Sequence, residues 1–157
     1  MRTVIKRYLG HDEDEGFTLI ELMVVVLIIG ILLAIAIPTF LGARNSANAK
    51  ASESNLRNAL TAEKTIYAQS QSYTATAASL SAIENNLSWV TATPSSGTNQ
   101  VQVSVDASGN LFLTAVGKDN QCYGVEDTGS ATTYGKVAYS SGCTFASYSS
   151  TPSAAGW

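Results

Sequence analysis

The longest hydrophobic pattern in the chain is an uninterrupted apolar run near its amino terminus. No polar side chain occurs between Leu22 and Ile37. With its flanking residues the run covers about 25 residues, and a helix of that length crosses the hydrocarbon core of a bilayer. Glu21 is a carboxylate just inside this run. A charge at the bilayer centre costs about 2.5–3.5 kcal/mol on insertion scales, so we expect Glu21 to have a partner.

A polar segment with a single apolar stripe follows the run. Apolar residues recur every three or four positions, as on one face of a helix; they are Ala49, Leu56, Ala59, Leu60, Ile66 and Tyr67. Glu53 and Arg57 are spaced for an ion pair along that helix. We therefore expect one helix from about Phe17 to Ser70, whose second half packs on a domain through the stripe.

Short alternating segments predict a sheet in the rest of the chain. Val101–Val105 and Leu111–Val116 form a predicted β-hairpin, with Leu111, Leu113 and Ala115 on one face. Further strands are expected at Trp89–Thr91, Cys122–Val125 and Lys136–Tyr139. The predicted fold class is α+β: one long amino-terminal helix packed on a small antiparallel sheet of three to four strands.

One short helix is predicted in the region between the long helix and the sheet. A short helix is expected over residues 79–87, because Ser81 and Glu84 are spaced as in a capping box. Tyr73–Thr76, just before it, is expected to be extended. We expect this region to connect the helix to the sheet.

The composition argues against an enzyme or a nucleic-acid-binding protein. Charged residues make up only 13% of the chain, and the net charge is −3, which provides no basic surface for nucleic acid. His11 is the one histidine, and it lies in the segment before Gly16. No phosphate-binding glycine loop, CxxC or HExxH is present. We expect no catalytic residues, cofactor or metal.

Three acidic residues form a candidate calcium site. Asp119, Glu126 and Asp127 provide carboxylate oxygens, the ligands that Ca²⁺ prefers. The prediction that we favour for these residues is a solvated acidic turn.

The residues around the start of the apolar run resemble a known family. Gly16, Phe17 and Glu21 match the cleavage motif of type IV prepilins and type II secretion pseudopilins, and Gly30 and Pro38 fall where that family carries a glycine and a proline. The resemblance covers about residues 16–70. It implies a leader, residues 1–16, a transmembrane and filament-core helix, residues 17–42, and an extracellular pilin head domain, residues 43–157.

The resemblance also implies how the chain is processed and assembled. A prepilin peptidase cuts between Gly16 and Phe17, and the new amino group of Phe17 is methylated. Glu21 then pairs with the Phe17 amine of a neighbouring copy, while Gly30 and Pro38 let the helix kink. The implied partners are other copies of this chain, the prepilin peptidase/methyltransferase, the membrane, the assembly platform protein and the assembly ATPase.

The implied function is a structural subunit of a type IV pilus, the major pilin, in a filament for adhesion, twitching motility or DNA uptake. The chain first spans the cytoplasmic (inner) membrane once, with its amino terminus inside and its carboxyl terminus outside, and then enters the extracellular pilus. The alternatives are a type II secretion pseudopilin and a minor pilin that binds DNA or a surface. Outside the family, the alternatives are an ordinary signal peptide and a plain membrane anchor.

Cys122 and Cys143 are the only two cysteines. The predicted anchor sends the residues that follow it outside the cytoplasm, where thiols oxidise, so one disulfide is expected. Pilins often carry such a carboxyl-terminal disulfide loop. Two reduced buried thiols are the alternative.

Overall fold

The computed structural model describes residues 16–91, 99–139, 143 and 156–157. Most of the predicted leader therefore lies outside the described residues. The chain divides into two compact units, one that ends at Phe40 and one that spans Leu41–Trp157. We call the second the head unit and describe each unit by itself.

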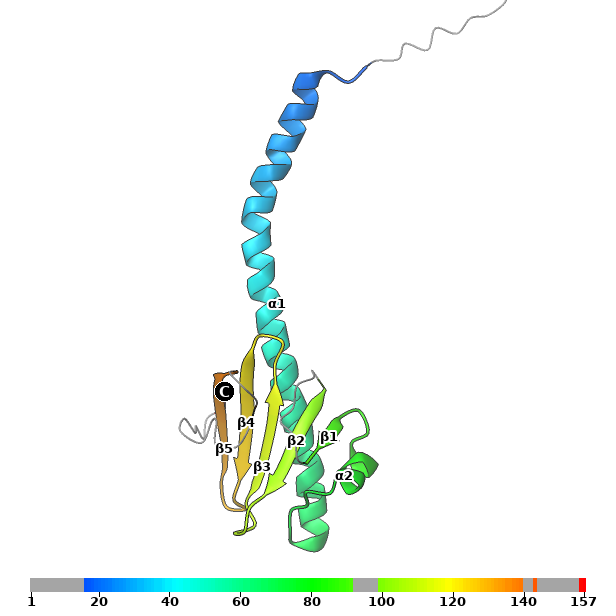
Figure 1. Cartoon of the computed structure of the whole chain (residues 1–157), viewed down its shortest axis with the longest axis vertical. Helices are drawn as coiled ribbons and strands as arrows, with labels where there is room; N and C mark the ends of the chain where they lie inside the picture. Colours follow the sequence, from blue (N-terminus) through cyan, green and yellow to red (C-terminus); the bar gives the residue numbers. More distant parts are fainter. Residues whose placement is uncertain (1–15, 92–98, 140–142, 144–155) are drawn as a thin grey trace, which may run out of the picture. The chain divides into compact units, whose positions relative to one another are not determined.

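Helix α1, Leu19–Ser70, is a single helix of 52 residues that contains Pro38 (Figure 1). Proline lacks a backbone donor and crowds the carbonyl four residues before it. The helix nevertheless continues, as predicted, and the Thr39 hydroxyl donates to the carbonyl oxygen of Ile35 at 3.0 Å. Up to Phe40 every α1 side chain is exposed. This part of the helix therefore contributes nothing to a core within the described chain.

The head unit contains a five-stranded sheet in the order β1-β2-β3-β4-β5. Its strands are β1, Ser88–Val90, β2, Gln100–Val105, β3, Leu111–Val116, β4, Gln121–Asp127, and β5, Thr132–Ala138. β1 pairs with β2 in parallel, and all other neighbours are antiparallel. Each antiparallel pair joins strands that are consecutive in the chain, so short turns suffice.

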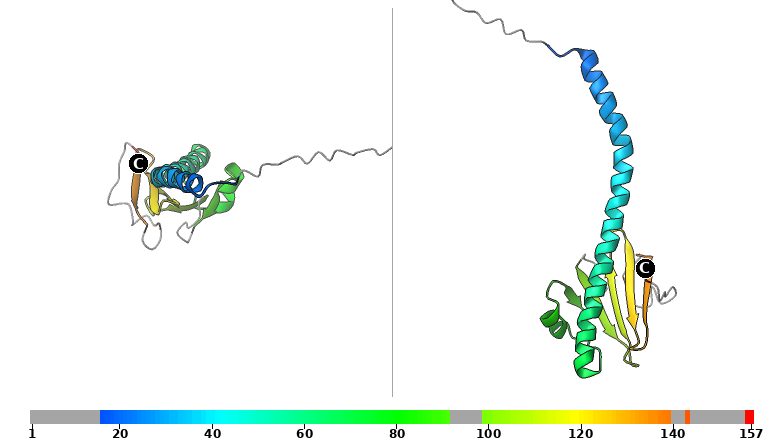
Figure 2. Two further views of the ribbon diagram at one scale, coloured as in Figure 1. Left: turned by 90° about the horizontal axis from the view of Figure 1, so that it is seen from above. Right: turned by 180° about the vertical axis from the view of Figure 1, so that it is seen from behind.

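One face of the sheet packs against the second part of α1 (Figure 2). Because side chains alternate along a strand, the odd-numbered positions of β2, β3 and β4 share that face. The core formed there includes Leu56, Ala59, Leu60, Val101, Val103, Leu111, Leu113, Tyr123 and Val125. Burial of this apolar surface is the main stabilising contribution to the head unit.

The opposite face of the sheet is covered in part by Cys143. The disulfide from Cys122 brings Cys143 to this face, with a Cα–Cα distance of 5.5 Å, and the Thr114 hydroxyl donates to the Cys143 carbonyl oxygen at 3.2 Å. Thr114 and Cys122, which contact Cys143, are buried although they face away from α1, and so is Phe112. β3 is therefore buried on both faces.

The predicted α+β fold is confirmed, and so are the hairpin and the apolar stripe of α1. Ala49 and Ile66 of the stripe pack at the edge of the core, and Leu56, Ala59 and Leu60 are buried in it. The sheet gains a fifth strand because β1, with only three residues, adds to its edge through the parallel pairing of Ser88–Val90. The alternation of apolar and polar residues alone does not reveal with which edge strand of the sheet so short a segment pairs.

Two local predictions were wrong. The short helix α2 spans Ala77–Ile83 and follows Thr76, so Ser81 lies inside it and Glu84 is at its carboxyl end rather than in a capping box. Glu53 pairs with Lys50 at 2.8 Å instead of with Arg57. The Arg57 guanidinium lies 5.5 Å from the centre of the Trp157 ring, so a tertiary cation–π contact replaces the local ion pair.

Candidate functional site: the amino-terminal end of the long helix

The first turn of α1 holds the carboxylate of Glu21 by a capping box. The backbone N–H of Thr18 donates to Glu21 Oε2 at 2.9 Å, and the Thr18 hydroxyl donates to the same oxygen at 2.6 Å. In return, the Glu21 backbone N–H donates to the Thr18 hydroxyl at 3.3 Å. Thr18 precedes the helix, so this is the reciprocal arrangement that satisfies the free donors of a helix start.

This capping box is a structural feature of the candidate site that the sequence prediction missed. Thr18 and Glu21 are separated by two residues, the spacing that defines the motif. The sequence interpretation sought a partner for Glu21 only on another copy of the chain. Within one chain Oε2 already has two donors, whereas Oε1 makes no hydrogen bond to any described residue. One oxygen therefore remains available to a donor from outside.

The predicted cleavage site lies next to this carboxylate and is open. Gly16 precedes the helix and has no atom within 4 Å of the position that a Cβ would occupy. Phe17 is 79% exposed. The peptide bond between Gly16 and Phe17 is therefore accessible, and a free amine at Phe17 would begin four residues before Glu21.

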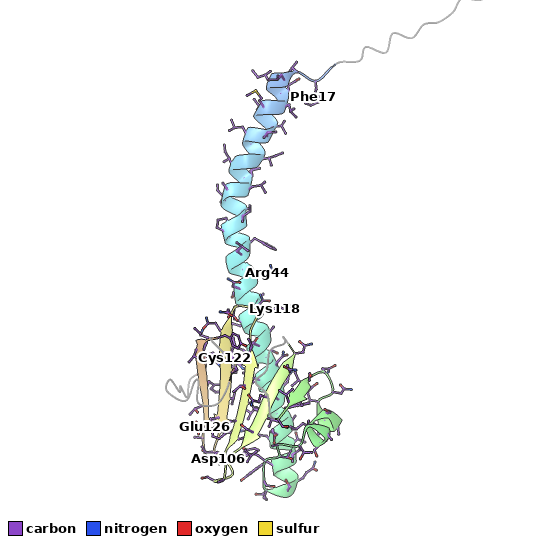
Figure 3. All side chains as sticks on the ribbon, viewed as in Figure 1. Phe17, Arg44, Asp106, Lys118, Cys122 and Glu126 are labelled. Atoms are coloured by element: carbon purple, nitrogen blue, oxygen red, sulfur yellow. A yellow bond between two sulfur atoms is a disulfide. The ribbon has the colours of Figure 1, made fainter. Side chains whose placement is uncertain are left out.

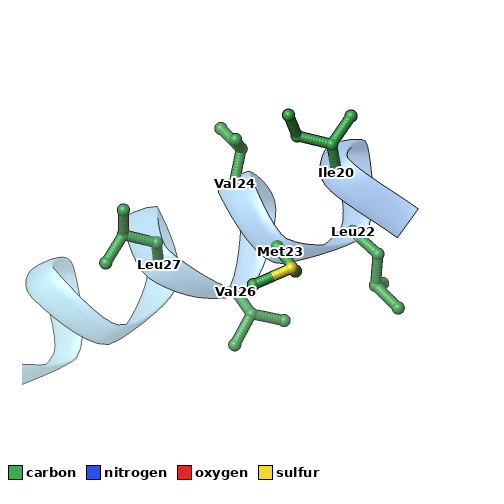
Figure 4. Close-up of a pocket in the computed structure, with 6 residues that line it drawn as sticks. All are labelled: Ile20, Leu22, Met23, Val24, Val26 and Leu27. Carbon is green, nitrogen blue, oxygen red and sulfur yellow. The ribbon is translucent and has the colours of Figure 1, made fainter. Parts of the chain in front are cut away.

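The apolar part of α1 presents hydrocarbon on every side. Figure 4 shows six side chains of its first turns projecting away from the helix in different directions; they are Ile20, Leu22, Met23, Val24, Val26 and Leu27. By length and composition α1 is able to cross a membrane, with a mean hydropathy of 3.1 over its most apolar 18 residues. A helix that is apolar all round requires lipid or other apolar helices around it.

Gly30 and Pro38 lie farther along this apolar surface. Both are helical, and Gly30 has no side chain within 4 Å of its missing Cβ. Glycine and proline are the residues least favourable to a helix interior. The structure therefore places two weak points in the apolar half of α1, and the helix is continuous through both.

The head unit contains no group of three or more metal-ligating side chains among its described residues. The favoured prediction of a solvated acidic turn is wrong for Asp127, which is at the end of β4 and only 1% exposed. Lys64 Nζ lies 3.0 Å from its Oδ2, and the Tyr73 hydroxyl donates to Oδ1 at 2.5 Å. Asp119 accepts a hydrogen bond from the Tyr123 hydroxyl at 2.5 Å. These carboxylates are thus engaged in holding the head unit together.

The disulfide between Cys122 and Cys143 is formed (Figure 3). It joins β4 to the segment after β5, and both residues are buried. The predicted disulfide is thus confirmed, and it joins an inner strand of the sheet to Cys143.

Comparisons with known proteins agree with these features. Residues 14–37 match the family model of the prokaryotic N-terminal methylation motif. Over 63 residues the chain is 44% identical to the type IV major pilin protein PilA of Myxococcus xanthus, an alignment that covers 40% of this chain and 29% of the relative. Over 66 residues it is 41% identical to the type IV wide pilus major component PilA4 of Thermus thermophilus, covering 42% of this chain and 50% of the relative. The alignments thus span half or less of each relative's length.

Proposed function

We propose that this chain, which carries the amino-terminal methylation motif and the α+β fold of the type IV pilins, is a structural subunit of a type IV pilus, with the role of a major pilin. The observation that carries the proposal is an apolar helix, exposed on all sides, that begins at a capped carboxylate next to an open glycine bond. The two relatives are major subunits by name. The proposed role is one of assembly and requires no catalytic residues.

The first step of the proposed mechanism is processing. The prepilin peptidase/methyltransferase removes residues 1–16 and methylates the amino group of Phe17. Until then residues 17–42 anchor the chain in the cytoplasmic membrane, with the head domain, residues 43–157, outside. Basic residues before the helix favour the cytoplasmic side, and the leader contains Arg2, Lys6 and Arg7.

The second step is pairing between copies. Thr18 holds Oε2 of Glu21, so the carboxylate is already oriented and its other oxygen is free for the Phe17 amine of a neighbouring copy. In a bundle of apolar helices a mismatched neighbour would leave a buried charge without a partner, which costs about 3–5 kcal/mol. That cost disfavours every axial offset between helices except the paired one. Glu21 therefore selects the register of the filament.

The third step is packing of the helices. Extraction from lipid into a bundle replaces one apolar environment by another, so the apolar half of α1 need not contact water. Gly30 and Pro38 weaken the helix at two points and allow it to adjust to its neighbours. The assembly platform protein and the assembly ATPase are the proposed source of work for extraction.

The experiment is to shear filaments from cells and to determine the amino terminus of their main protein by mass spectrometry. We expect a dominant chain that begins at methylated Phe17. A sheared fraction without this chain would contradict a pilus subunit and favour the pseudopilin alternative. A chain that retains Met1 would contradict the proposed processing.

The Glu21→Ala variant tests the pairing step. We expect the variant to insert into the membrane at the wild-type level but to yield no sheared filaments, because the Phe17 amine has no carboxylate partner. Thr18→Ala is the matched variant: it removes the hydroxyl of the cap but keeps the carboxylate, so filaments should still form. Glu84→Ala, at the end of α2, is the control in the head unit. Normal filaments from Glu21→Ala would refute the pairing.

A further inference from the structure

The head unit has a pocket of about 270 Å³ where three separate parts of the chain meet. The carboxyl-terminal end of α1, the β2–β3 turn and the β4–β5 turn each contribute to it. Asp106, in the first of these turns, is labelled at this end of the sheet in Figure 3. The residues that line the pocket are Tyr67, Gln71, Ser72, Tyr73, Val105, Ser108, Gly109, Thr128 and Gly129.

The residues that line the pocket are mostly aromatic or polar, and none is charged. The rings of Tyr67 and Tyr73 lie with their centres 4.6 Å apart, so they form one amphipathic wall. The other contributions are an amide, hydroxyl groups and the backbone of two glycines. An apolar wall with a few placed polar groups is the usual composition of a small-molecule site, and the volume is just below the usual range of about 300–1,000 Å³.

The pocket is held in shape by hydrogen bonds beneath its surface. Asp106 accepts from the backbone N–H groups of Ser108 and Asn110, each at 2.8 Å, which fixes the β2–β3 turn. Asp127 accepts from the Gly129 backbone N–H at 2.8 Å and from the Tyr73 hydroxyl at 2.5 Å. The wall and both turns are thus fixed before any ligand arrives, which reduces the entropy lost on binding.

The two glycines allow this shape. Gly109 has φ +84° and Gly129 has φ +78°, conformations that side chains with a Cβ rarely adopt. At both positions the backbone lines the pocket, and an added Cβ at Gly129 would lie 3.5 Å from the Tyr67 hydroxyl oxygen. Two turns from different hairpins therefore approach the same space without filling it.

Hydrogen-bonding groups in the pocket remain available. The hydroxyls of Tyr67 and Ser108 make no hydrogen bond to another described residue. Gln71 donates through Nε2 to the Tyr67 carbonyl at 3.4 Å, which leaves its Oε1 as an acceptor. The pocket thus offers two hydroxyls and an amide oxygen near an aromatic wall.

We propose that this pocket binds a single neutral sugar ring, such as the terminal hexose of a glycan. A hexose has an apolar face of C–H groups for the tyrosine wall and a rim of hydroxyls for the free donors and acceptors. A phosphate or carboxylate ligand is disfavoured, because no lining residue is cationic. The pocket lies wholly in the head unit, so this inference goes beyond the proposed role in assembly.

The test is saturation-transfer NMR on the full chain, purified in a detergent that has no sugar headgroup. The probes are glucose, galactose and N-acetylglucosamine, with glucuronic acid and inorganic phosphate as charged comparators. We expect magnetisation transfer to the ring protons of at least one neutral sugar and none to glucuronic acid, and no competition by phosphate. Since the chain is tested as separate subunits, the result does not depend on whether it forms filaments.

Two variants locate the binding. Tyr67→Phe keeps the ring and removes one hydroxyl, so we expect the affinity to fall about fivefold. Ser108→Trp replaces a small lining residue by a large side chain and should abolish binding. Tyr134→Phe removes a hydroxyl outside the pocket, where the ring centre lies 4.7 Å from that of Trp157, and should bind as the wild type. The proposal is overturned if no neutral sugar binds, if the charged probes bind equally, or if Tyr67→Phe and Ser108→Trp leave binding unchanged.

Discussion

At the scale of single residues, two buried carboxylates of the head unit have opposite properties. Glu63 is fully buried, and burial raises its pKa to about 7 against the opposing effect of the Thr74 backbone N–H that donates to it at 3.2 Å. Burial also acts to raise the pKa of Asp127, but the donors Thr132, Tyr73, Lys64 and the Gly129 N–H outweigh it and hold the pKa below its usual value. The number of hydrogen-bond donors to each carboxylate therefore decides whether its pKa is raised or lowered.

Glu63 makes the head unit less stable as the pH rises. The folded state binds its proton more tightly than the unfolded state, whose pKa is 4.5. The contribution of Glu63 to stability is therefore highest below pH 4.5 and falls as the pH rises to about 7, by about 3 kcal/mol at most. Urea unfolding of the full chain in detergent between pH 4.5 and 8 measures the slope. In Glu63→Gln we expect the slope to be strongly reduced, and an unchanged slope would contradict this origin.

Asp127 is expected to matter more than its ionic partner. Asp127→Ala removes the acceptor of four donors and should lower the free energy of unfolding by about 3 kcal/mol. Lys64 is 51% exposed, so Lys64→Ala should cost about 1 kcal/mol or less. Lys118→Ala is the control for loss of a lysine. Urea unfolding at pH 7 ranks the three variants, and an equal cost for Lys64→Ala and Asp127→Ala would show that the ion pair alone accounts for the effect.

At the scale of elements, the disulfide links the sheet to a residue that the hydrogen bonds between strands do not hold. β4 lies in the middle of the antiparallel strands, and the disulfide attaches to it the segment after β5. The attached residue, Cys143, contacts Thr114 on the face of β3 that points away from α1. The bond therefore contributes to burial as well as to the connectivity of the chain.

Removal of the disulfide should weaken the head unit without abolishing its fold. The cysteines are 21 residues apart, and a loop of that size contributes about 3 kcal/mol in the chain-entropy description. We expect a Cys122→Ala/Cys143→Ala variant to lose about that much free energy of unfolding, while the core between α1 and the sheet persists. Circular dichroism during urea unfolding measures both. Loss of all structure, or no loss of stability, would be contrary to this expectation.

At the scale of the whole molecule, one helix runs through two units that need different surroundings. Every residue of the buried cluster, from Leu56 onward, belongs to the head unit, and the large apolar side chains before Gly42 are exposed. The first unit needs lipid or other helices, whereas the head unit buries its own apolar residues. This division is what a subunit that moves from a membrane into a filament requires.

The division predicts how a truncated chain behaves. Residues 41–157 alone should be soluble without detergent, monomeric and disulfide-bonded, because their core is complete without the first unit. The full chain should need detergent and aggregate without it. Size-exclusion chromatography with light scattering distinguishes the two. A fragment that aggregates would show that the head unit depends on residues before Leu41.

The sequence by itself determined the features whose signals are local. The apolar run, the motif from Gly16 to Glu21, the stripe of α1 and the hairpin of β2 and β3 follow from periodicity and spacing, and the two cysteines allowed only one pairing. The capping box of Thr18 and Glu21 was also readable, because its spacing is local. Such patterns survive in sequence because neighbouring residues in the chain remain neighbours in the fold.

Only the tertiary structure decided the contacts between distant residues. Arg57 lies over Trp157 rather than beside Glu53, and Asp127 is buried because α1 and the β4–β5 turn surround it. The parallel pairing of β1 and the pocket near Tyr67 likewise depend on where the turns meet. Burial and partner choice are decided by which elements approach in space, and the free energy of a charge changes with that environment far more than with its neighbours in the chain.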